Sequence, residues 1–145
     1  MTAEIQAQLD QLALSRSTPF CYHCYTEAPT GRCNACGSDD LMRLVAGVGC
    51  EYGLDWIASH ILETELSPIN LEEAFEESMR ECYPETTVVG WASMDTVRIL
   101  KKMDPVSWRC AVADWESAEA AEGNIVTLDN GTTYFWLYDV ESLLR

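Results

Sequence analysis

Apolar residues recur at helical spacing in several stretches of the chain, and capping or breaking residues bound most of these stretches. Thr2 precedes the first stretch and Asn70 precedes another, and both side chains are typical N-caps. Asp104 and Pro105 start a later stretch, and Gly123 ends it. The pattern therefore predicts helices over residues 3–14, 51–66, 71–82, 94–103 and 105–122, and a short helix from about residue 140.

Runs rich in β-branched and aromatic residues predict strands where turn-forming residues flank them. A brief strand is expected at residues 41–45 and a buried strand at 86–91. Residues 125–128 and 132–138, joined by Asp129-Asn130-Gly131, give the strongest hairpin signal of the chain. The order of elements predicts an α+β fold, in which a helix-rich domain carries a small antiparallel sheet.

The composition indicates a folded domain rather than a membrane protein. Hydrophobic residues make up 48% of the 145 residues, enough for the core of one domain with at most a small appended module. No apolar stretch approaches 18 residues, and the first ten residues lack the apolar region of a signal peptide. We therefore expect no membrane span, no secretion and a cytoplasmic location.

The chain is strongly acidic, with 24 acidic and 9 basic residues and a net charge of −15. This balance disfavours direct binding to nucleic acid or to an anionic membrane surface. Residues 1–50 carry a net charge of −2 and residues 51–145 carry −13. The shift predicts two domains, residues 1–45 and residues 46–145, of which the second is the acidic one.

Four of the seven cysteines form two C-x-x-C pairs, Cys21 with Cys24 and Cys33 with Cys36, separated by eight residues. An odd total without an export signal favours a reducing compartment over a disulfide framework. Two intervening residues let one tight turn present both sulfurs to a single ion, and zinc prefers four thiolates in tetrahedral geometry. Four cysteines close the coordination shell, so the predicted zinc is structural.

This doubled pair resembles the zinc ribbon family, specifically its small double-knuckle members, over residues 21–37 only. The resemblance implies a zinc-ribbon-like module at the N-terminal end of the chain. Tyr25 occupies a position where that family usually has glycine. The first knuckle is therefore expected to be distorted or closer to a treble-clef arrangement.

Other chemistries of the same cysteines stay open. Four thiolates also suit tetrahedral iron, which geometry alone does not separate from zinc. Cys21-Tyr-His-Cys24 superficially resembles the C-x-H-C motif of disulfide oxidoreductases, but no buried strand and helix flank it as redox catalysis requires. His23 is expected to be a solvent-facing knuckle residue rather than a ligand.

An enzyme of unrecognised chemistry is the alternative function, with Cys50, His60 and nearby carboxylates as its candidate residues. No motif brings Cys50 and His60 together, so the interpretation as a core thiol and an ordinary helix histidine is favoured, and no residue is assigned as catalytic. Cys82 and Cys110 are expected to be buried thiols on apolar helix faces.

Glutamates recur at helical spacing in residues 71–82, which places Glu72, Glu73, Glu76 and Glu77 on one charged face. A second acidic surface is expected from Asp114, Glu116, Glu119 and Glu122. Such faces keep a protein soluble, but rows of carboxylates can also imitate the phosphates of duplex DNA. The sharper hypothesis is an interaction protein with a basic partner, such as a DNA-mimic inhibitor of a nucleic-acid-binding enzyme.

Two further surfaces carry competing hypotheses. Successive side chains of a strand point to opposite faces, so the aromatic residues of 134–138 lie on both faces of the C-terminal hairpin. Either both faces are covered, or one exposes an aromatic patch. A partner, such as a second copy in a homodimer, would bury such a patch. A DNA-binding regulator would need local basicity, which only Arg16, Arg32 and Arg43 offer near the cysteines.

Overall fold

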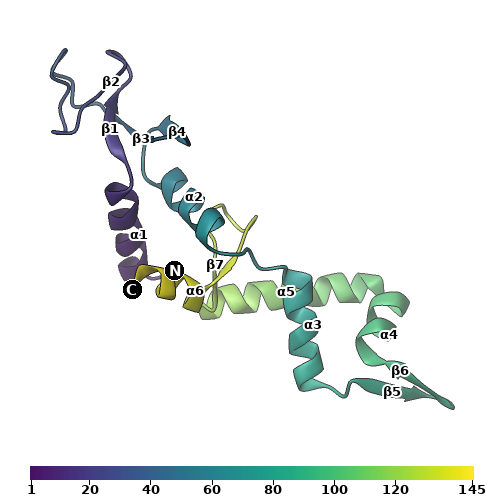
Figure 1. Ribbon diagram of the computed structural model, residues 1–145. Coiled ribbons are helices and arrows are strands. Elements are labelled where there is room, and N and C mark those ends of the chain that lie inside the picture. Colours follow the sequence, from purple (N-terminus) through teal and green to yellow (C-terminus); the bar gives the residue numbers. More distant parts are fainter. The chain divides into compact units, whose positions relative to one another are not determined.

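The computed structural model describes residues 1–145 and contains six helices and eight short strands (Figure 1). The helices are α1 (Ala3–Ser15), α2 (Asp55–Glu65), α3 (Leu71–Cys82), α4 (Thr96–Met103), α5 (Pro105–Glu122) and α6 (Leu137–Leu144). The strands are β1 (Thr18–Cys21), β2 (Thr26–Glu27), β3 (Met42–Val45), β4 (Gly49–Glu51), β5 (Thr86–Val89), β6 (Ala92–Asp95), β7 (Ile125–Val126) and β8 (Phe135–Trp136). The predicted α+β class is confirmed. None of the helices combines the length and apolarity needed to cross a membrane.

The chain divides into two compact units, which are described separately. The terminal unit comprises Met1–Pro68 and Val126–Arg145, and the middle unit comprises Ile69–Ile125. Their boundaries follow packing rather than the shift in charge near residue 45, because α1 packs against α2 and α6. The division into residues 1–45 and 46–145 stays a prediction about domains.

The terminal unit joins an antiparallel sheet to a helical core. Its four strands lie in the order β2-β1-β3-β4, with Leu44 paired to both Thr18 and Cys50. The helical core is aliphatic apart from one phenylalanine and consists of Ile5, Leu9, Ala58, Leu62, Val126, Phe135 and Val140. Arg43 of β3 donates to the Leu14 and Ser17 carbonyls, at 3.1 and 2.9 Å, which ties the sheet to the C-terminal end of α1.

The middle unit contains α3, the β5–β6 hairpin, α4 and α5 around a small aromatic core. Phe75, Val97 and Trp108 are its buried core residues, and the Phe75 and Trp108 rings meet edge to face at 4.9 Å. The caps act as predicted: the Asn70 side chain accepts from the backbone N–H of Glu73, and Asp104 starts α5. Gly123 ends α5 with a φ of 81°, the left-handed conformation that favours glycine.

Two strands shorten helices that the sequence predicts, because pairing with a neighbouring strand decides their conformation. The helix predicted from residue 51 begins at Asp55, since residues 49–51 pair with β3 as β4. The helix predicted from residue 94 begins at Thr96, since residues 92–95 pair with β5 as β6. The predicted C-terminal hairpin shortens to two-residue strands, because Asp129 Oδ1 accepts from Thr133 N (2.8 Å) and holds a wider loop.

Several burial predictions were wrong. All four residues of β5 are exposed, and Trp91, in the turn that follows, is fully exposed. Cys82 and Cys110 are exposed rather than buried, because their helices bury other faces around Phe75 and Trp108. These errors share one cause: local periodicity does not say which face of an element another element covers.

Candidate metal centre

The cysteine pairs lie at the ends of a short hairpin and a following loop. Strand β1 ends at Cys21, which pairs with Thr26 across the first turn. The backbone N–H of Ala28 donates to the Pro19 carbonyl at 2.8 Å and prolongs this pairing. The loop then returns Cys33 and Cys36 to the same end of the hairpin. Backbone pairing therefore fixes the first pair of cysteines, and the loop brings the second pair to it.

The four cysteine sulfurs form one cluster, as the spacing predicts. The Sγ atoms of Cys21, Cys24, Cys33 and Cys36 all lie within 4.8 Å of one another. The Cys21 and Cys36 sulfurs are 3.7 Å apart, and a tetrahedron with zinc–sulfur bonds of about 2.3 Å has edges of about 3.8 Å. Cys21 and Cys33 are buried, whereas Cys36 is exposed. The donor set fits a tetrahedral thiolate metal site at the surface of the terminal unit.

Both knuckles use a left-handed residue directly after their second cysteine. Gly37 follows Cys36 with a φ of 73°, and its N–H donates to the Cys33 carbonyl at 2.8 Å. Tyr25 follows Cys24 with a φ of 53°, a conformation that costs a non-glycine residue about 1–2 kcal/mol. Its ring contacts Phe20 edge to face at 5.3 Å, which offsets part of that cost. Tyr25 therefore adopts the left-handed conformation that favours glycine, and the distorted or treble-clef-like form of this knuckle stays a prediction.

Backbone N–H groups, burial and neighbouring thiols shift the pKa values of three of the four cysteines, in opposite directions. Backbone N–H groups of Cys36 and Ala35 lower the pKa of Cys33 to about 6. The Cys36 thiol, burial and the other thiols raise the pKa of Cys24 to about 12. The Cys24 backbone N–H pulls the pKa of Cys21 down, but burial and the Cys33 and Cys36 thiols outweigh it and raise the pKa. A divalent ion bound to the four sulfurs would stabilise their thiolate forms.

No other group of three or more cysteine, histidine or acidic side chains comes as close together in the chain. His23 is exposed, as expected of a knuckle residue outside the ligand set. Cys50 lies on β4 and His60 on α2, both half-buried, and neither forms such a cluster with carboxylates. The structure therefore supplies no observation in favour of the enzyme alternative.

The glutamates of α3 divide into two pairs with different surroundings. Lys101 lies 3.0 Å from Glu72 and 2.6 Å from Glu76, and the Trp108 indole N–H donates to Glu72 at 3.1 Å. Glu73 and Glu77 are exposed and form no ion pair. Two members of the predicted partner-binding face thus serve the packing of the middle unit, and two remain at the surface.

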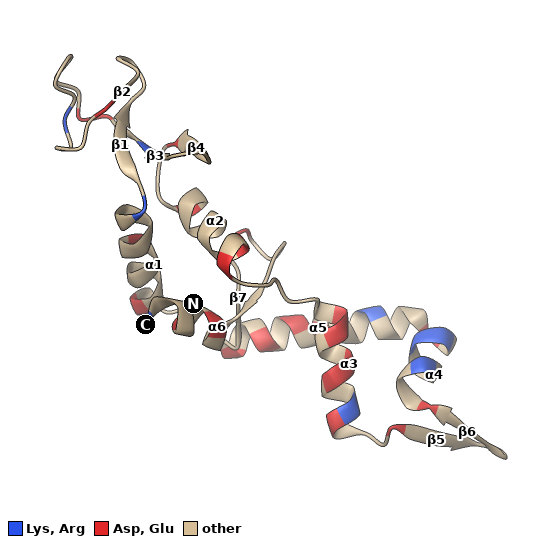
Figure 2. Cartoon of the chain, viewed as in Figure 1, with Lys and Arg blue, Asp and Glu red and all other residues tan.

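Negative charge is not confined to one unit. The middle unit has 12 acidic and 5 basic residues, a net of −7, and the terminal unit has 12 and 4, a net of −8. Within the middle unit, however, acids dominate α3 and the second half of α5, whereas α4 has three bases and no acid (Figure 2). Charge is therefore segregated among the helices of the middle unit, whereas the shift near residue 45 of the sequence does not separate the two units.

The bases near the cysteines are largely engaged. Arg16 forms an ion pair with Glu65, and Arg43 donates to backbone carbonyls and to Ser17 Oγ. Arg32 alone is exposed and forms no ion pair. One free arginine provides little of the positive field that a nucleic-acid surface requires.

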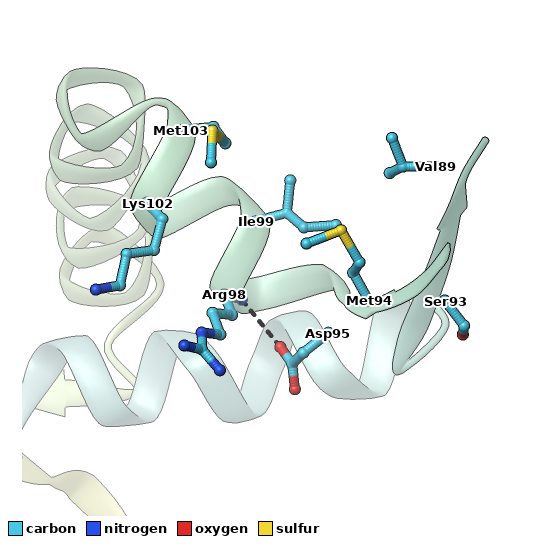
Figure 3. A pocket seen from close by; sticks show the side chains of 8 residues that line it. All are labelled: Val89, Ser93, Met94, Asp95, Arg98, Ile99, Lys102 and Met103. Carbon is cyan, nitrogen blue, oxygen red and sulfur yellow. Dashed lines mark hydrogen bonds between the residues drawn. The ribbon is translucent and has the colours of Figure 1, made fainter. Parts of the chain in front are cut away.

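The sequence analysis missed a groove beside the β5–β6 hairpin. It has a volume of about 720 Å³ and is lined by residues of the hairpin and of α4: Val89, Ser93, Met94, Asp95, Arg98, Ile99, Lys102 and Met103 (Figure 3). The available signals were Gly90-Trp91 after a β-branched run and the basic segment of residues 98–102.

No protein-family model matches the chain, and comparisons with curated proteins and with solved structures find no similar protein.

Proposed function

We propose that this chain is a zinc-binding interaction protein, in which Cys21, Cys24, Cys33 and Cys36 hold one structural zinc and an acidic helical surface binds a basic protein partner. The observation that carries the zinc assignment is the single cluster of four sulfurs within 4.8 Å. Zinc would crosslink the two knuckles there. Four thiolates complete a tetrahedral shell and leave no position for substrate, so the proposed role is structural.

Elemental analysis of the purified protein tests the metal. One zinc per chain is expected, and it should be lost in Cys33→Ser. Cys50→Ser is the matched control, because it removes a thiol outside the cluster and should keep the zinc. Four freely titrating thiols at the cluster positions with a zinc ratio near zero would contradict the proposal, and iron in place of zinc would correct the identity of the ion.

The acidic surface of the middle unit supports the second half of the proposal. Glu73, Glu77, Asp114 and Glu122 are exposed on α3 and α5. A net charge of about 2–8 in magnitude suffices to keep a small domain soluble, and this chain carries −15. Carboxylates on rigid helices provide a surface for a basic groove, so the finer form of the proposal is a DNA mimic that occupies a restriction, repair or CRISPR enzyme.

The surface is tested by reversing Glu73 and Glu77 to Lys, which spares the packed pair Glu72 and Glu76. Glu4→Lys with Glu141→Lys is the matched control, because it changes the net charge equally at exposed positions of the terminal unit. Proteins captured from the native host by wild type, variant and control are compared by mass spectrometry. A basic nucleic-acid enzyme captured by wild type and control, but not by the variant, is the expected result.

The affinity of that enzyme for each protein, measured across a salt series, completes the test. Binding by wild type should weaken as salt screens the exposed charges over about 8–10 Å, and reversal of Glu73 and Glu77 should remove most of this dependence. Equal affinities and equally flat salt curves for all three proteins would leave the acidic helices as a solvated surface only.

A further inference from the structure

The β5–β6 hairpin exposes more apolar surface than its size explains. Gly90 and Trp91 form its two-residue turn, closed by the pair Val89 and Ala92, and Gly90 has the positive φ (63°) that such turns need. Trp91 is fully exposed, and Val88 and Val89 are 71% and 54% exposed. A two-stranded hairpin is marginally stable in water unless something packs on it. The apolar side chains at the tip of the hairpin are therefore available to pack against another surface.

The groove beside the hairpin also exposes apolar side chains. Met94 and Ile99 point toward each other between the hairpin and α4, and Met103, 77% exposed, lies at its rim (Figure 3). Methionine side chains adapt their shape and are well suited to receive an aromatic ring. Trp91 does not line this groove, and as a fully exposed side chain it touches nothing in its own copy. An apolar anchor and an apolar receptacle thus lie on the same unit, both unfilled.

The basic side chains that line the groove are suited to cation–π contacts with an aromatic side chain. Arg98 and Lys102 line it, are exposed and form no ion pair, whereas Lys101, on the same helix, is held by Glu72 and Glu76. The third charged lining residue, Asp95, is paired with Arg80 and caps α4. Cations bind the face of an indole ring, and Lys101 already lies 5.7 Å from the centre of the Trp108 ring. A tryptophan entering the groove would meet two free cations.

We propose that two copies of this chain associate through the middle unit, with Trp91 of each copy seated in the groove of the other. A two-fold axis makes such a contact self-complementary: the anchor of one protomer fills the receptacle of its partner, and the reverse. A nucleic acid fits this surface poorly, because the middle unit carries −7 overall.

The proposed contact is small, which favours a weak, transient dimer. Each tryptophan buries about 150–250 Å², and the two copies add Val88, Val89, Met94 and Met103 from both sides. The total lies near the low end of specific interfaces, about 1,200 Å². We therefore expect a dissociation constant on the order of micromolar. This surface differs from the C-terminal aromatic hairpin, where Tyr134 and Phe135 are buried and Trp136 stacks on Tyr138 at 5.9 Å.

Sedimentation velocity of the full zinc-loaded chain, from about 1 to 200 µM, tests the dimer. Wild type should shift from monomer to dimer over this range. Trp91→Ser removes the anchor and Met103→Glu blocks the groove, and each should raise the dissociation constant at least tenfold. Tyr138→Ser is the matched control, because it removes an exposed aromatic of the terminal unit and should leave the dimer intact. Unchanged near-ultraviolet circular dichroism and thermal midpoint show that each variant is folded.

A mixing experiment then distinguishes reciprocal seating from any other contact. The Trp91→Ser protein keeps its groove, and the Met103→Glu protein keeps its anchor, so a one-to-one mixture can form one of the two contacts. Heterodimers should appear in the mixture at concentrations where each variant alone is monomeric. A monomeric wild type at the highest concentration, a dimer insensitive to Trp91→Ser, loss of the dimer in Tyr138→Ser, or no heterodimer in the mixture would overturn the proposal.

Discussion

The terminal unit and the middle unit each have a small hydrophobic core, and different interactions stabilise them. The terminal unit has an aliphatic core at α1, α2 and α6 and, beyond it, a cysteine module whose buried residues are only Phe20, Cys21, Ala28 and Cys33. The middle unit relies on an aromatic core wrapped by ion pairs among Lys101, Glu72 and Glu76. Burial of a few side chains rarely offsets the entropy of ordering a segment. We therefore expect the cysteine module of the terminal unit to depend on the proposed metal, and the middle unit to depend on Trp108 and its polar surroundings.

Removal of the metal should produce the largest effect, and it should be confined to one part of the terminal unit. Structural zinc in small modules contributes about 10–16 kcal/mol of apparent binding free energy, far more than Phe20 and Ala28 supply by burial. A chelator or Cys33→Ser should abolish amide-exchange protection in residues 18–45, while α3, α4 and α5 keep theirs. Protection in residues 18–45 that survives chelation would show that the module folds without metal.

Trp108→Ala should produce the next largest loss of stability, in the middle unit and not in the cysteine module. Trp108 is 6% exposed, contacts Phe75 and donates to Glu72. Its truncation should cost about 3–5 kcal/mol, which is close to the whole stability of a unit this small. Exchange protection should fall in α3, α4 and α5, and zinc content should stay at one per chain. Val106→Ala is the control in the same unit, because its side chain is 61% exposed and lies outside the cluster of Phe75, Val97 and Trp108. Loss of zinc in Trp108→Ala would show that the units are not separately stabilised.

The contrast between the units also shows which features the sequence can predict. Helix ends were predictable where a cap acts on its own helix, as Thr2, Asn70 and Gly123 do. The cysteine cluster was predictable because the C-x-x-C spacing is itself the local geometry of a knuckle. The contacts of Glu72 were not, since Lys101 and Trp108 lie 29 and 36 residues away and only the packing of α4 and α5 on α3 brings them together.

Burial and strand pairing were the least predictable features. The run Thr86–Val89 has the composition of a buried strand, yet all four of its residues are exposed. β4 and β6 form because Leu44 and Val88 lie opposite Cys50 and Ser93, and such register depends on partners rather than on the strand's own residues. Sequence periodicity indicates how a segment folds locally, and packing decides what it faces.

Acid should affect the middle unit through Glu72, with a smaller effect than the loss of Trp108. Hydrogen bonds from Lys101 and Trp108 lower the pKa of Glu72 below its ordinary value of 4.5. A carboxyl with a lowered pKa in the folded state stabilises that state above its unfolded pKa, and this contribution is lost as the pH falls through the folded pKa. Unfolding of the middle unit should therefore become easier below about pH 4.5, and Glu72→Gln should flatten part of that dependence. Urea unfolding between pH 3 and 7, followed at α3 by nuclear magnetic resonance, measures it. Glu73→Gln is the control, and an equal flattening by both variants would assign the effect to general charge.

The smallest effect is expected at Tyr25, where two terms oppose each other. Tyr25→Gly relieves a left-handed backbone that costs about 1–2 kcal/mol, but it removes the ring contacts with Phe20 and Tyr22, worth about 0.5–1.5 kcal/mol each. Their near cancellation predicts a change in stability of under about 1 kcal/mol and zinc affinity within about tenfold of wild type. Gly37→Val makes the equivalent position of the second knuckle β-branched, with strain and no compensating contact, and should weaken zinc binding more. Competition with a zinc chelator measures both affinities. If Tyr25→Gly weakened zinc binding as much as Gly37→Val, the aromatic contacts, rather than the backbone conformation, would hold the first knuckle together.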